Sequence, residues 1–245
     1  MEFEGFNKIP RLNRNMVVTE KIDGTNAAIV IEPLEHEGDY DESTVTVVTQ
    51  DWTTKKWVAI YCQSRKRIIK PGDDNFGFAA WVSANAIELT KLGEGRHFGE
   101  WWGGGIQRGY GLQGGGEPDR RFSLFNVKRW SDSACAAHGY ERPACVEVVP
   151  VLEEYAFDQN RIATVLNTLR EGGSKAAPGF MDPEGVVVYH VAARQMFKVT
   201  LEDDAKPKGA HGNVVVNNHA PTGSLISPHA IGGGQPPVAL LEAYA

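Results

Sequence analysis

A lysine stands between two carboxylates in the segment Thr-Glu-Lys-Ile-Asp-Gly-Thr-Asn at residues 19–26. A neutral lysine amine can attack the α-phosphorus of a nucleoside triphosphate and then carry the nucleotide through a P–N bond. The reaction also needs a cation that reduces the negative charge of the phosphates, and a backbone that leaves room for the nucleotide. Asp23 can orient Lys21 or its metal, and Gly24 can leave that room. Lys21 is therefore a candidate covalent nucleophile.

The composition is that of a globular protein without a membrane segment. Of the 245 residues, 42% are hydrophobic, which is enough for a substantial core. No run of about 18 apolar residues occurs, and the acidic start Met-Glu-Phe-Glu-Gly has no apolar signal core, so we predict a cytoplasmic location. Cys62, Cys135 and Cys145 are odd in number and form no Cys-x-x-Cys pair, which predicts neither a disulfide framework nor a zinc site.

The net charge of -6 argues against a protein that coats nucleic acid by bulk electrostatics. Two basic clusters are nevertheless compatible with a local basic groove, and Trp130 near the second could stack on bases. The clusters are Arg65, Lys66, Arg67 and Lys70, and Arg120, Arg121, Lys128 and Arg129. For each cluster taken alone, solvated charge at the end of a strand is an equally good interpretation.

Alternation of β-branched or aromatic residues with polar ones predicts a chain made mostly of strands. The predicted strands are residues 26–31, 44–49, 57–63, 96–101, 121–127, 144–151, 185–189 and 195–201. The glycine-rich residues 103–116 are a flexible connection, either beside the nucleotide or nucleic-acid surface or as an inert loop. Many strands with two substantial helices favour an α+β fold with mixed, mainly antiparallel sheets and flanking helices over a doubly wound parallel sheet.

The two predicted helices are residues 73–93 and 159–171, each with an aspartate cap candidate and a closing glycine. The first is expected to bury Phe76, Ala80, Ala86, Leu89 and Leu92. The second is expected to bury Ile162, Val165, Leu166 and Leu169.

The composition changes after residue 204, where bulky apolar residues become rare. We therefore divide the chain into a domain at residues 1–204 and a flexible C-terminal tail at residues 205–245. His211, His219 and His229 in the tail are too scattered to predict a metal site.

The segment Lys-Ile-Asp-Gly at residues 21–24 resembles the nucleotidyl-transfer motif of the covalent nucleotidyltransferases, which include ATP-dependent DNA ligases, RNA ligases and mRNA-capping enzymes. The later motifs of that superfamily follow in order. They are Phe-Gly-Glu-Trp at residues 98–101, Phe-Ser-Leu-Phe-Asn-Val at 122–127, Glu-Gly-Val-Val-Val at 184–188 and Phe-Lys-Val-Thr at 197–200. The resemblance implies an ATP-grasp-like nucleotidyltransferase domain.

The resemblance also implies roles for individual residues. Glu100 would lie close to the ribose and the metal, Phe125 would stack on the purine, and Glu184 would help hold Mg²⁺ or Mn²⁺. Carboxylates suit such cations. Lys198 would contact the α-phosphate and would help lower the pKa of Lys21 by repulsion between like charges.

The closer likeness is to RNA ligases of the phage ligase-2 type, and it covers residues 3–204. Their pattern Glu-Lys-Ile-x-Gly-Thr-Asn matches residues 20–26, which adds Glu20 and Asn26 to the cofactor-binding residues. Arg65, in Ser64-Arg65, stands where these enzymes place an arginine that contacts the ribose or the phosphates. The segment at residues 147–152 is similar to their Val-Pro-Val-Leu strand.

The sequence departs from the family pattern in three ways, of which the first two concern the phosphate-handling steps more than adenylation. Thr200 stands where these ligases have a second lysine, for which Lys206 or Lys208 could substitute. Asn126 stands where an aspartate is common. Residues 205–245 leave no room for the OB-fold domain of DNA ligases and capping enzymes, or for the helical domain of ligase-2-type enzymes.

The resemblance implies an ATP-dependent RNA ligase that joins 5′-phosphate and 3′-hydroxyl ends. Lys21, Asp23 and Lys198 would be catalytic, and Glu100 and Glu184 would hold the metal. The partner would be RNA ends or a nicked duplex, and an accessory protein could supply additional grip; a compact ligase of this kind would suit a phage or a bacterium. Two alternatives remain open: an ATP-dependent DNA ligase, and a nucleotide-binding or nucleic-acid-binding module that has lost catalysis.

Overall fold

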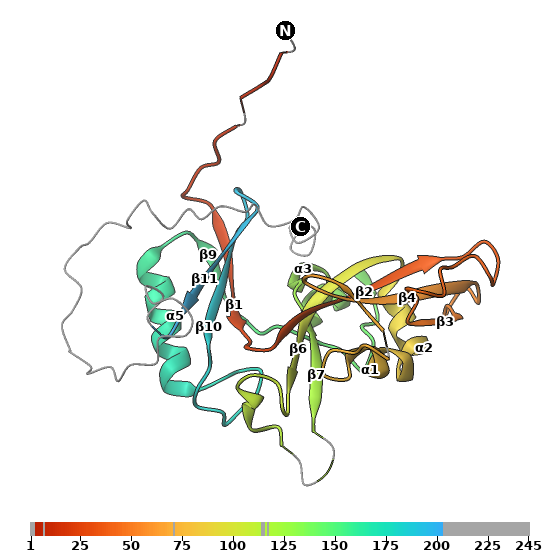
Figure 1. The fold of residues 1–245 in the computed structure, drawn as a ribbon. Helices are drawn as coiled ribbons and strands as arrows, with labels where there is room; N and C mark the ends of the chain where they lie inside the picture. Colours follow the sequence, from red (N-terminus) through yellow and green to blue (C-terminus); the bar gives the residue numbers. More distant parts are fainter. Residues whose placement is uncertain (1–2, 7, 71, 114–115, 117, 203–245) are drawn as a thin grey trace.

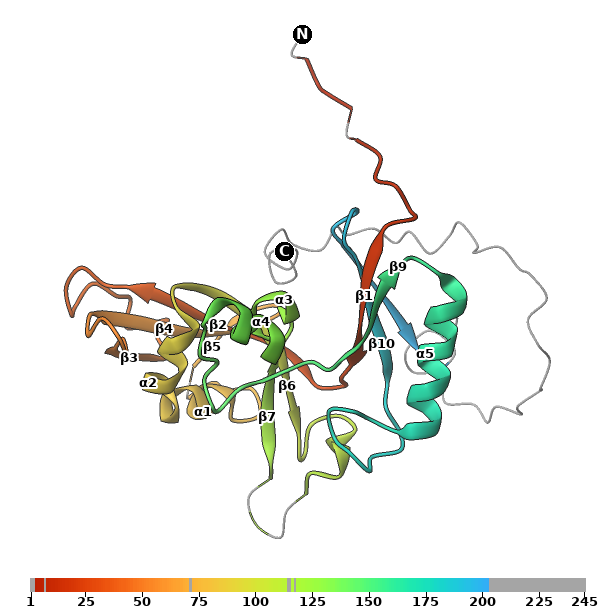
Figure 2. The ribbon, with the colours of Figure 1, turned by 180° about the vertical axis from the view of Figure 1, so that it is seen from behind.

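A computed structural model describes residues 3–6, 8–70, 72–113, 116 and 118–202. Two β-sheets lie side by side, and the chain passes from one to the other between β1 and β2 (Figures 1 and 2). The pairing is antiparallel throughout except between the short strands β7 and β8. The predicted α+β class with mainly antiparallel sheets is confirmed.

The smaller sheet has the strand order β11-β10-β1-β9. Its strands are β1 (Asn15–Lys21), β9 (Val151–Ala156), β10 (Gly185–His190) and β11 (Gln195–Thr200). Helix α5 (Gln159–Gly172) packs against this sheet, and Val165 and Leu169 are buried against Met16 and Val18. The predicted helix at residues 159–171, its inward residues and its Asp158 cap are confirmed, since the Asp158 side chain accepts from the Asn160 amide.

The larger sheet has the strand order β3-β4-β2-β6-β7-β8, with β5 paired to β4. Its strands are β2 (Thr25–Pro33), β3 (Val47–Gln50), β4 (Trp57–Ser64), β5 (Ile68–Ile69), β6 (Gly95–Gly103), β7 (Arg120–Leu124) and β8 (Glu147–Val148). The short elements are α1 (Phe78–Ala84), α2 (Ala86–Leu89), η1 (Thr90–Leu92), η2 (Gly109–Gly111), α3 (Val127–Trp130) and α4 (Asp132–His138). The main core lies between this sheet and α1 and α2, where Phe78, Trp101 and Phe122 pack ring against ring.

The single helix predicted at residues 73–93 is wrong in two respects. The segment is broken at Asn85 into α1, α2 and η1, and Phe76 and Ala80 are exposed while Phe78 and Val82 are buried. The aspartate that stabilises the first turn is Asp74, whose carboxylate accepts from the amides of Ala79 and Ala80 at 2.9 and 3.0 Å although it precedes the helix by four residues. The spacing of apolar residues predicts the buried face of a helix correctly only when the helix is continuous.

Two strand predictions also change at their ends. The strand expected at residues 121–127 ends at Leu124, because Asn126 caps α3, which begins at Val127. The strand expected at residues 144–151 is divided into β8 and β9, which belong to different sheets.

Among the described residues, no helix has the length and apolar character needed to span a membrane. All three cysteines are free, and burial raises the pKa of Cys62 to about 12. The predicted tail at residues 205–245, with its three histidines, Lys206 and Lys208, lies outside the described residues.

His97 on β6 makes the stability of the larger sheet depend on pH. Burial lowers its pKa to about 4, and the charge of Arg129 adds to the effect while a hydrogen bond with the Gly93 carbonyl opposes it. Between about pH 6.5 and pH 4, His97 is protonated in the unfolded chain and neutral in the folded protein. The free energy of unfolding therefore decreases as the pH falls through this window. We expect the free energy of unfolding in urea to fall by about 2 to 3 kcal/mol from pH 7 to pH 4.5 on account of this group.

The His97→Gln variant should show a correspondingly smaller pH dependence. A variant of the exposed His36, His36→Gln, is the matched control and should retain the wild-type dependence. Equal pH dependence in wild type and His97→Gln would contradict the assignment.

Candidate active site

Lys21 is the last residue of β1, and its Nζ donates to Glu184 Oε2 at 2.5 Å. The two residues are 163 positions apart in the sequence. They meet because the antiparallel register of β1 with β10 pairs Lys21 with Gly185, which follows Glu184 directly. The Lys21 side chain is 24% exposed and that of Glu184 is 10% exposed. The predicted nucleophile and one predicted metal ligand are therefore in contact at the edge of a cavity.

Glu100 on β6 approaches the same turn from the other sheet. Its Oε1 accepts from the Gly24 amide at 3.2 Å, and the register of β2 with β6 pairs it with Asn26. Burial raises the pKa of Glu100 to about 8, although the charge of Lys21 and the hydrogen bond from Gly24 act in the opposite direction. The nearby carboxylates of Glu184 and Asp23 raise the pKa further, so the site gathers negative charge that is poorly solvated.

A divalent cation fits this donor set. The described residues contain no cluster of three or more His, Cys, Asp or Glu side chains that could hold a metal by themselves. Mg²⁺ is commonly held by one or two carboxylates together with phosphate oxygens and water. Glu100 and Glu184 are such a pair, and a cation beside them would relieve the cost of keeping both charged in a buried place.

Two adjoining cavities meet at Lys21. The first has a volume of about 370 Å³, and its lining is largely apolar, with Phe125, Val149 and Met196 among its residues. The second has a volume of about 520 Å³ and is largely polar. Lys21, Asn26, Arg65 and Glu100 line both. The first cavity suits a purine ring and the second suits phosphates, so a nucleotide that spans them would place its α-phosphate near Lys21.

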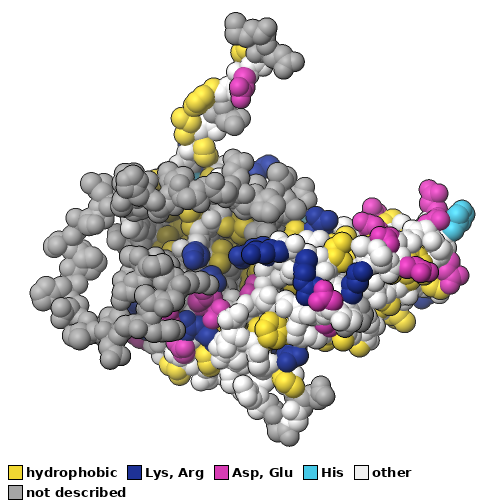
Figure 3. All heavy atoms as spheres, in the orientation of Figure 1, with side chains coloured by type: hydrophobic (Ala, Val, Ile, Leu, Met, Phe, Trp, Pro, Cys, Tyr) yellow, Lys and Arg dark blue, Asp and Glu magenta, His cyan; other side chains and the backbone are white. Residues whose placement is uncertain are grey.

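Lys198 on β11 also lines the first cavity, where the register pairs it with Val187. It is exposed and forms no ion pair within the part of the chain that the structure describes. The structure thus brings all the predicted site residues except Asp23 and Glu184 to the first cavity; Asp23 lines the second, and Glu184 contacts Lys21. Figure 3 shows Lys and Arg side chains around a hollow on this face of the molecule.

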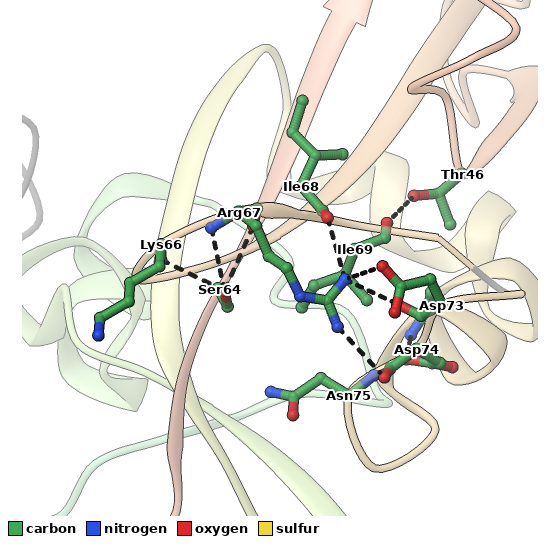
Figure 4. A network of polar contacts seen from close by, with 10 residues as sticks. Thr46, Ser64, Lys66, Arg67, Ile68, Ile69, Asp73, Asp74 and Asn75 are labelled. Carbon is green, nitrogen blue, oxygen red and sulfur yellow. Dashed lines mark hydrogen bonds and ion pairs between the residues drawn. The ribbon is translucent and has the colours of Figure 1, made fainter.

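The loop between β4 and β5 presents Arg65, Lys66 and Arg67 of the first basic cluster to the polar cavity. The Ser64 hydroxyl accepts from the amides of Lys66 and Arg67 at 3.3 and 3.2 Å, and Arg67 is tied to Asp73 at 2.7 Å. In Figure 4 the Lys66 side chain points away from this network. Arg67 therefore fixes the loop, while Arg65 and Lys66 form no ion pair with any described residue and line the polar cavity.

The three arginines of the second basic cluster are bound to neighbouring groups of the protein. Trp130 is 2% exposed and packs under the Arg129 guanidinium, so it offers no face to a base. Arg120 donates to the Gly104 and Phe76 carbonyls. Arg121 pairs with Asp119 and Glu147.

Glu20 lies beside Lys21, and its carboxylate is bound by other groups of the protein. It is 1% exposed, and its carboxylate accepts from the Ser174 hydroxyl at 2.6 Å and from the amides of Lys175 and Ala176 at 2.7 and 3.0 Å. Glu20 belongs to the lining of the first cavity, but both carboxylate oxygens are bound to the loop at residues 174–176. Its side chain holds that loop in place beside Lys21.

Two residues that the sequence did not reveal hold the turn after Lys21. The Tyr110 hydroxyl accepts from the Asp23 amide at 2.7 Å, and Arg108 Nε donates to the Asp23 carboxylate at 3.1 Å. Both belong to the glycine-rich stretch predicted as a flexible connection, which within residues 103–113 is a folded loop with η2. An arginine and a tyrosine among glycines were the only signal in the sequence.

The two substituted motif positions have defined structural roles. The Asn126 side chain caps α3 by accepting from the Arg129 amide at 3.0 Å, which an aspartate would do equally well. The Thr200 hydroxyl donates to the Glu202 carbonyl at 2.9 Å.

The chain belongs to the RNA ligase family, whose model matches residues 14–200. A search of curated proteins gave no significant match. Solved structures with a similar fold include three of the Naegleria gruberi RNA ligase. They are a point mutant with ATP and Mn (18% identity, TM-score 0.49), an apo mutant (18%, 0.48) and the enzyme with PPi (19%, 0.47). Each match covers 77% of this chain and 49 to 50% of the Naegleria chain, so the protein spans about half the length of those relatives.

Gly24 is required by the close packing of the β1–β2 connection against β6. A Cβ there would lie 2.5 Å from the Trp101 carbonyl oxygen and 2.7 Å from Trp102 Cβ, so the missing side chain makes room for β6 as well as lining the polar cavity. We expect Gly24→Ala to lower the free energy of unfolding by about 1 to 3 kcal/mol, because the strand must shift. Gly38→Ala is the matched control, since no atom lies within 4 Å of the added carbon. Equal denaturation midpoints for the two variants would contradict this account.

Proposed function

We propose that this protein is an ATP-dependent ligase that joins RNA ends and carries AMP covalently on Lys21. The observation that carries the proposal is the position of Lys21 Nζ at the junction of an apolar and a polar cavity, in contact with Glu184. Membership of the RNA ligase family supports it.

In the first step the Lys21 amine attacks the α-phosphorus of ATP. A bond forms between Nζ and phosphorus, the bond from phosphorus to the bridging oxygen breaks, and pyrophosphate leaves with that electron pair. Lys21 must first turn away from Glu184 and attack as the neutral amine, because the new bond uses the nitrogen lone pair; the protons that the nitrogen loses pass to solvent. Lys198, on the neighbouring part of the first cavity, would stabilise the negative charge that gathers on the phosphate in the transition state.

The remaining residues bind and orient the nucleotide. Phe125 offers its ring to the adenine in the apolar cavity, and Asn26 and Arg65 lie where the two cavities meet. Mg²⁺ or Mn²⁺ held by Glu100 and Glu184 would supply charge neutralisation at the phosphates. AMP then passes from Lys21 to a 5′-phosphate end, and a 3′-hydroxyl displaces AMP to form the phosphodiester bond.

Covalent labelling tests the first step. Wild-type protein incubated with α-labelled ATP and Mg²⁺ should retain label after denaturation, and the label should be lost in acid and kept in base, as expected for a P–N bond. Lys21→Ala should take no label, and a chelator should abolish labelling of the wild type. Lys56→Ala, at an exposed position outside both cavities, is the matched control and should be labelled normally. Absence of label with every divalent cation would refute the proposal, and preferential labelling by GTP would indicate a capping-type enzyme.

Sealing assays test the substrate. Nicked duplexes and single-stranded ends should be compared with RNA or DNA at the 3′-hydroxyl side, and we expect sealing to be faster with RNA. Faster sealing with DNA would identify a DNA ligase instead. A protein that forms lysyl-AMP but seals neither substrate would lack the later steps or need a partner that grips nucleic acid.

A further inference from the structure

Arg108 is bonded to three carboxylates from three separate parts of the chain. Its Nε, Nη1 and Nη2 donate to Asp23 at 3.1 Å, Asp182 at 2.6 Å and Glu202 at 2.9 Å, respectively. The guanidinium side chain is only 16% exposed. Burial alone would lower the pKa of Arg108, but its hydrogen bonds and the charges of Asp182 and Glu202 raise it above the ordinary value. The three partners lie 74 to 94 residues away in the sequence.

Each partner stands close in the chain to a residue of the proposed reaction. Asp23 is two residues after Lys21, Asp182 is two residues before Glu184, and Glu202 is four residues after Lys198. All three partners belong to the ends of strands of the smaller sheet, or to the segments joined to them. Arg108 itself follows β6, the strand of the larger sheet that carries Glu100. The Arg108 guanidinium therefore links strand ends of the smaller sheet to the larger sheet beside the candidate active site.

The loop that carries Arg108 is a firm support. Tyr110 packs against Trp102 and Phe180 with ring centroids 5.0 and 4.7 Å apart, and its hydroxyl accepts from the Asp23 amide. Gln107 and Tyr110 both have positive φ angles, of 45° and 51°. Residues other than glycine rarely adopt this backbone conformation. The packing of Tyr110 holds the loop in this conformation. The position of the Arg108 backbone therefore does not depend on the ion pairs that its side chain makes.

The geometry of the contacts matters more than their contribution to stability. The Asp182 and Glu202 side chains are 74% and 78% exposed, and ion pairs with such exposed partners contribute little to the free energy of folding. Three partners on three different nitrogens, however, require the planar fork of an arginine, and a lysine cannot reproduce it. A group that adds little stability but fixes three strand ends is suited to positioning.

We propose that Arg108 is a positioning residue for nucleotide transfer, which fixes the turn after Lys21 and the strand ends that bear Glu184 and Lys198 relative to Glu100. The inference rests on the proposed function. Neither Asp182 nor Glu202 lines either cavity, so their effect on the reaction passes through Arg108. Asp23 does line the polar cavity, and its orientation there depends on the same guanidinium.

The test measures the rate of lysyl-AMP formation in single-turnover reactions over a range of ATP concentrations. Arg108→Ala should lower the rate at saturating ATP by about 10- to 100-fold, because small displacements of reacting groups have effects of that size. The ATP concentration at half-maximal rate should change by less than about threefold, because the residues that bind the base are untouched. Arg108→Lys should recover only a minor part of the rate.

Arg142→Ala is the matched control, since Arg142 is also partly exposed and pairs with Asp132 and the Trp130 carbonyl, away from both cavities. It should leave the rate of lysyl-AMP formation unchanged. Glu202→Gln should lower that rate several-fold in the wild-type background and have no further effect in Arg108→Ala, because the two residues act through one contact. A rate for Arg108→Ala within about twofold of wild type, or additive losses in the double variant, would overturn the proposal.

Hydrogen exchange separates this inference from the proposed function. In Arg108→Ala the amides of residues 21–24 and 184–186 should exchange faster than in wild type, and they should not do so in Arg142→Ala. Unchanged exchange in both segments would overturn the positioning role. The wild-type protein could take no label from ATP while Arg108→Ala still exchanges faster than wild type in both segments. That result would refute the proposed ligase activity and still support the coupling of the strand ends by Arg108.

Discussion

The close approach of the β1–β2 connection to β6 is the constraint on which the site depends. The chain leaves the smaller sheet at Lys21 and enters the larger sheet at Thr25, so three residues cross from one sheet to the other. At Gly24 the backbone lies against Trp101 and Trp102 too closely for any Cβ. This contact holds Lys21 between Glu184 of one sheet and Glu100 of the other. A looser crossing would leave each sheet intact and separate the groups that the proposed reaction requires.

The electrostatics of the site follow from this geometry. Glu100, Glu184 and Asp23 come together around Lys21, and burial with two neighbouring carboxylates raises the pKa of Glu100 to about 8. A triphosphate would add still more negative charge, and cations would offset it. Arg65 and Lys66 border the polar cavity, and the paired glutamates suit a divalent ion. In the proposed function, a chain with a net charge of -6 would bind polyanions through a small, local set of cations.

The sequence predicted what depends on local pattern, and it failed where distant segments decide. Alternation located most strands, and α5 with its Asp158 cap was predicted almost to the residue because its apolar spacing is continuous. The segment after Asp74 was misjudged because the helix is interrupted at Asn85, and no local spacing reveals such a break. Lys21, Glu100 and Glu184 lie in short motifs and were identifiable from them. The bonds of Arg108 and Tyr110 to Asp23 span 85 and 87 residues, so only the folded chain shows them.

The division of the site between two sheets has a consequence for how the chemistry can be controlled. Lys21 and Lys198 lie on strands of the smaller sheet, and Glu184 directly precedes another, whereas Asn26, Glu100 and Phe125 belong to the larger sheet or follow its strands. In the proposed reaction the nucleotide would be held mainly by the larger sheet, while the groups that attack and stabilise its phosphate come from the smaller one. The relative position of the two sheets then determines the rate of nucleotide transfer more than it determines nucleotide binding. Contacts that join the sheets, such as the packing at Gly24 and the bonds of Arg108, control that position without touching the nucleotide base.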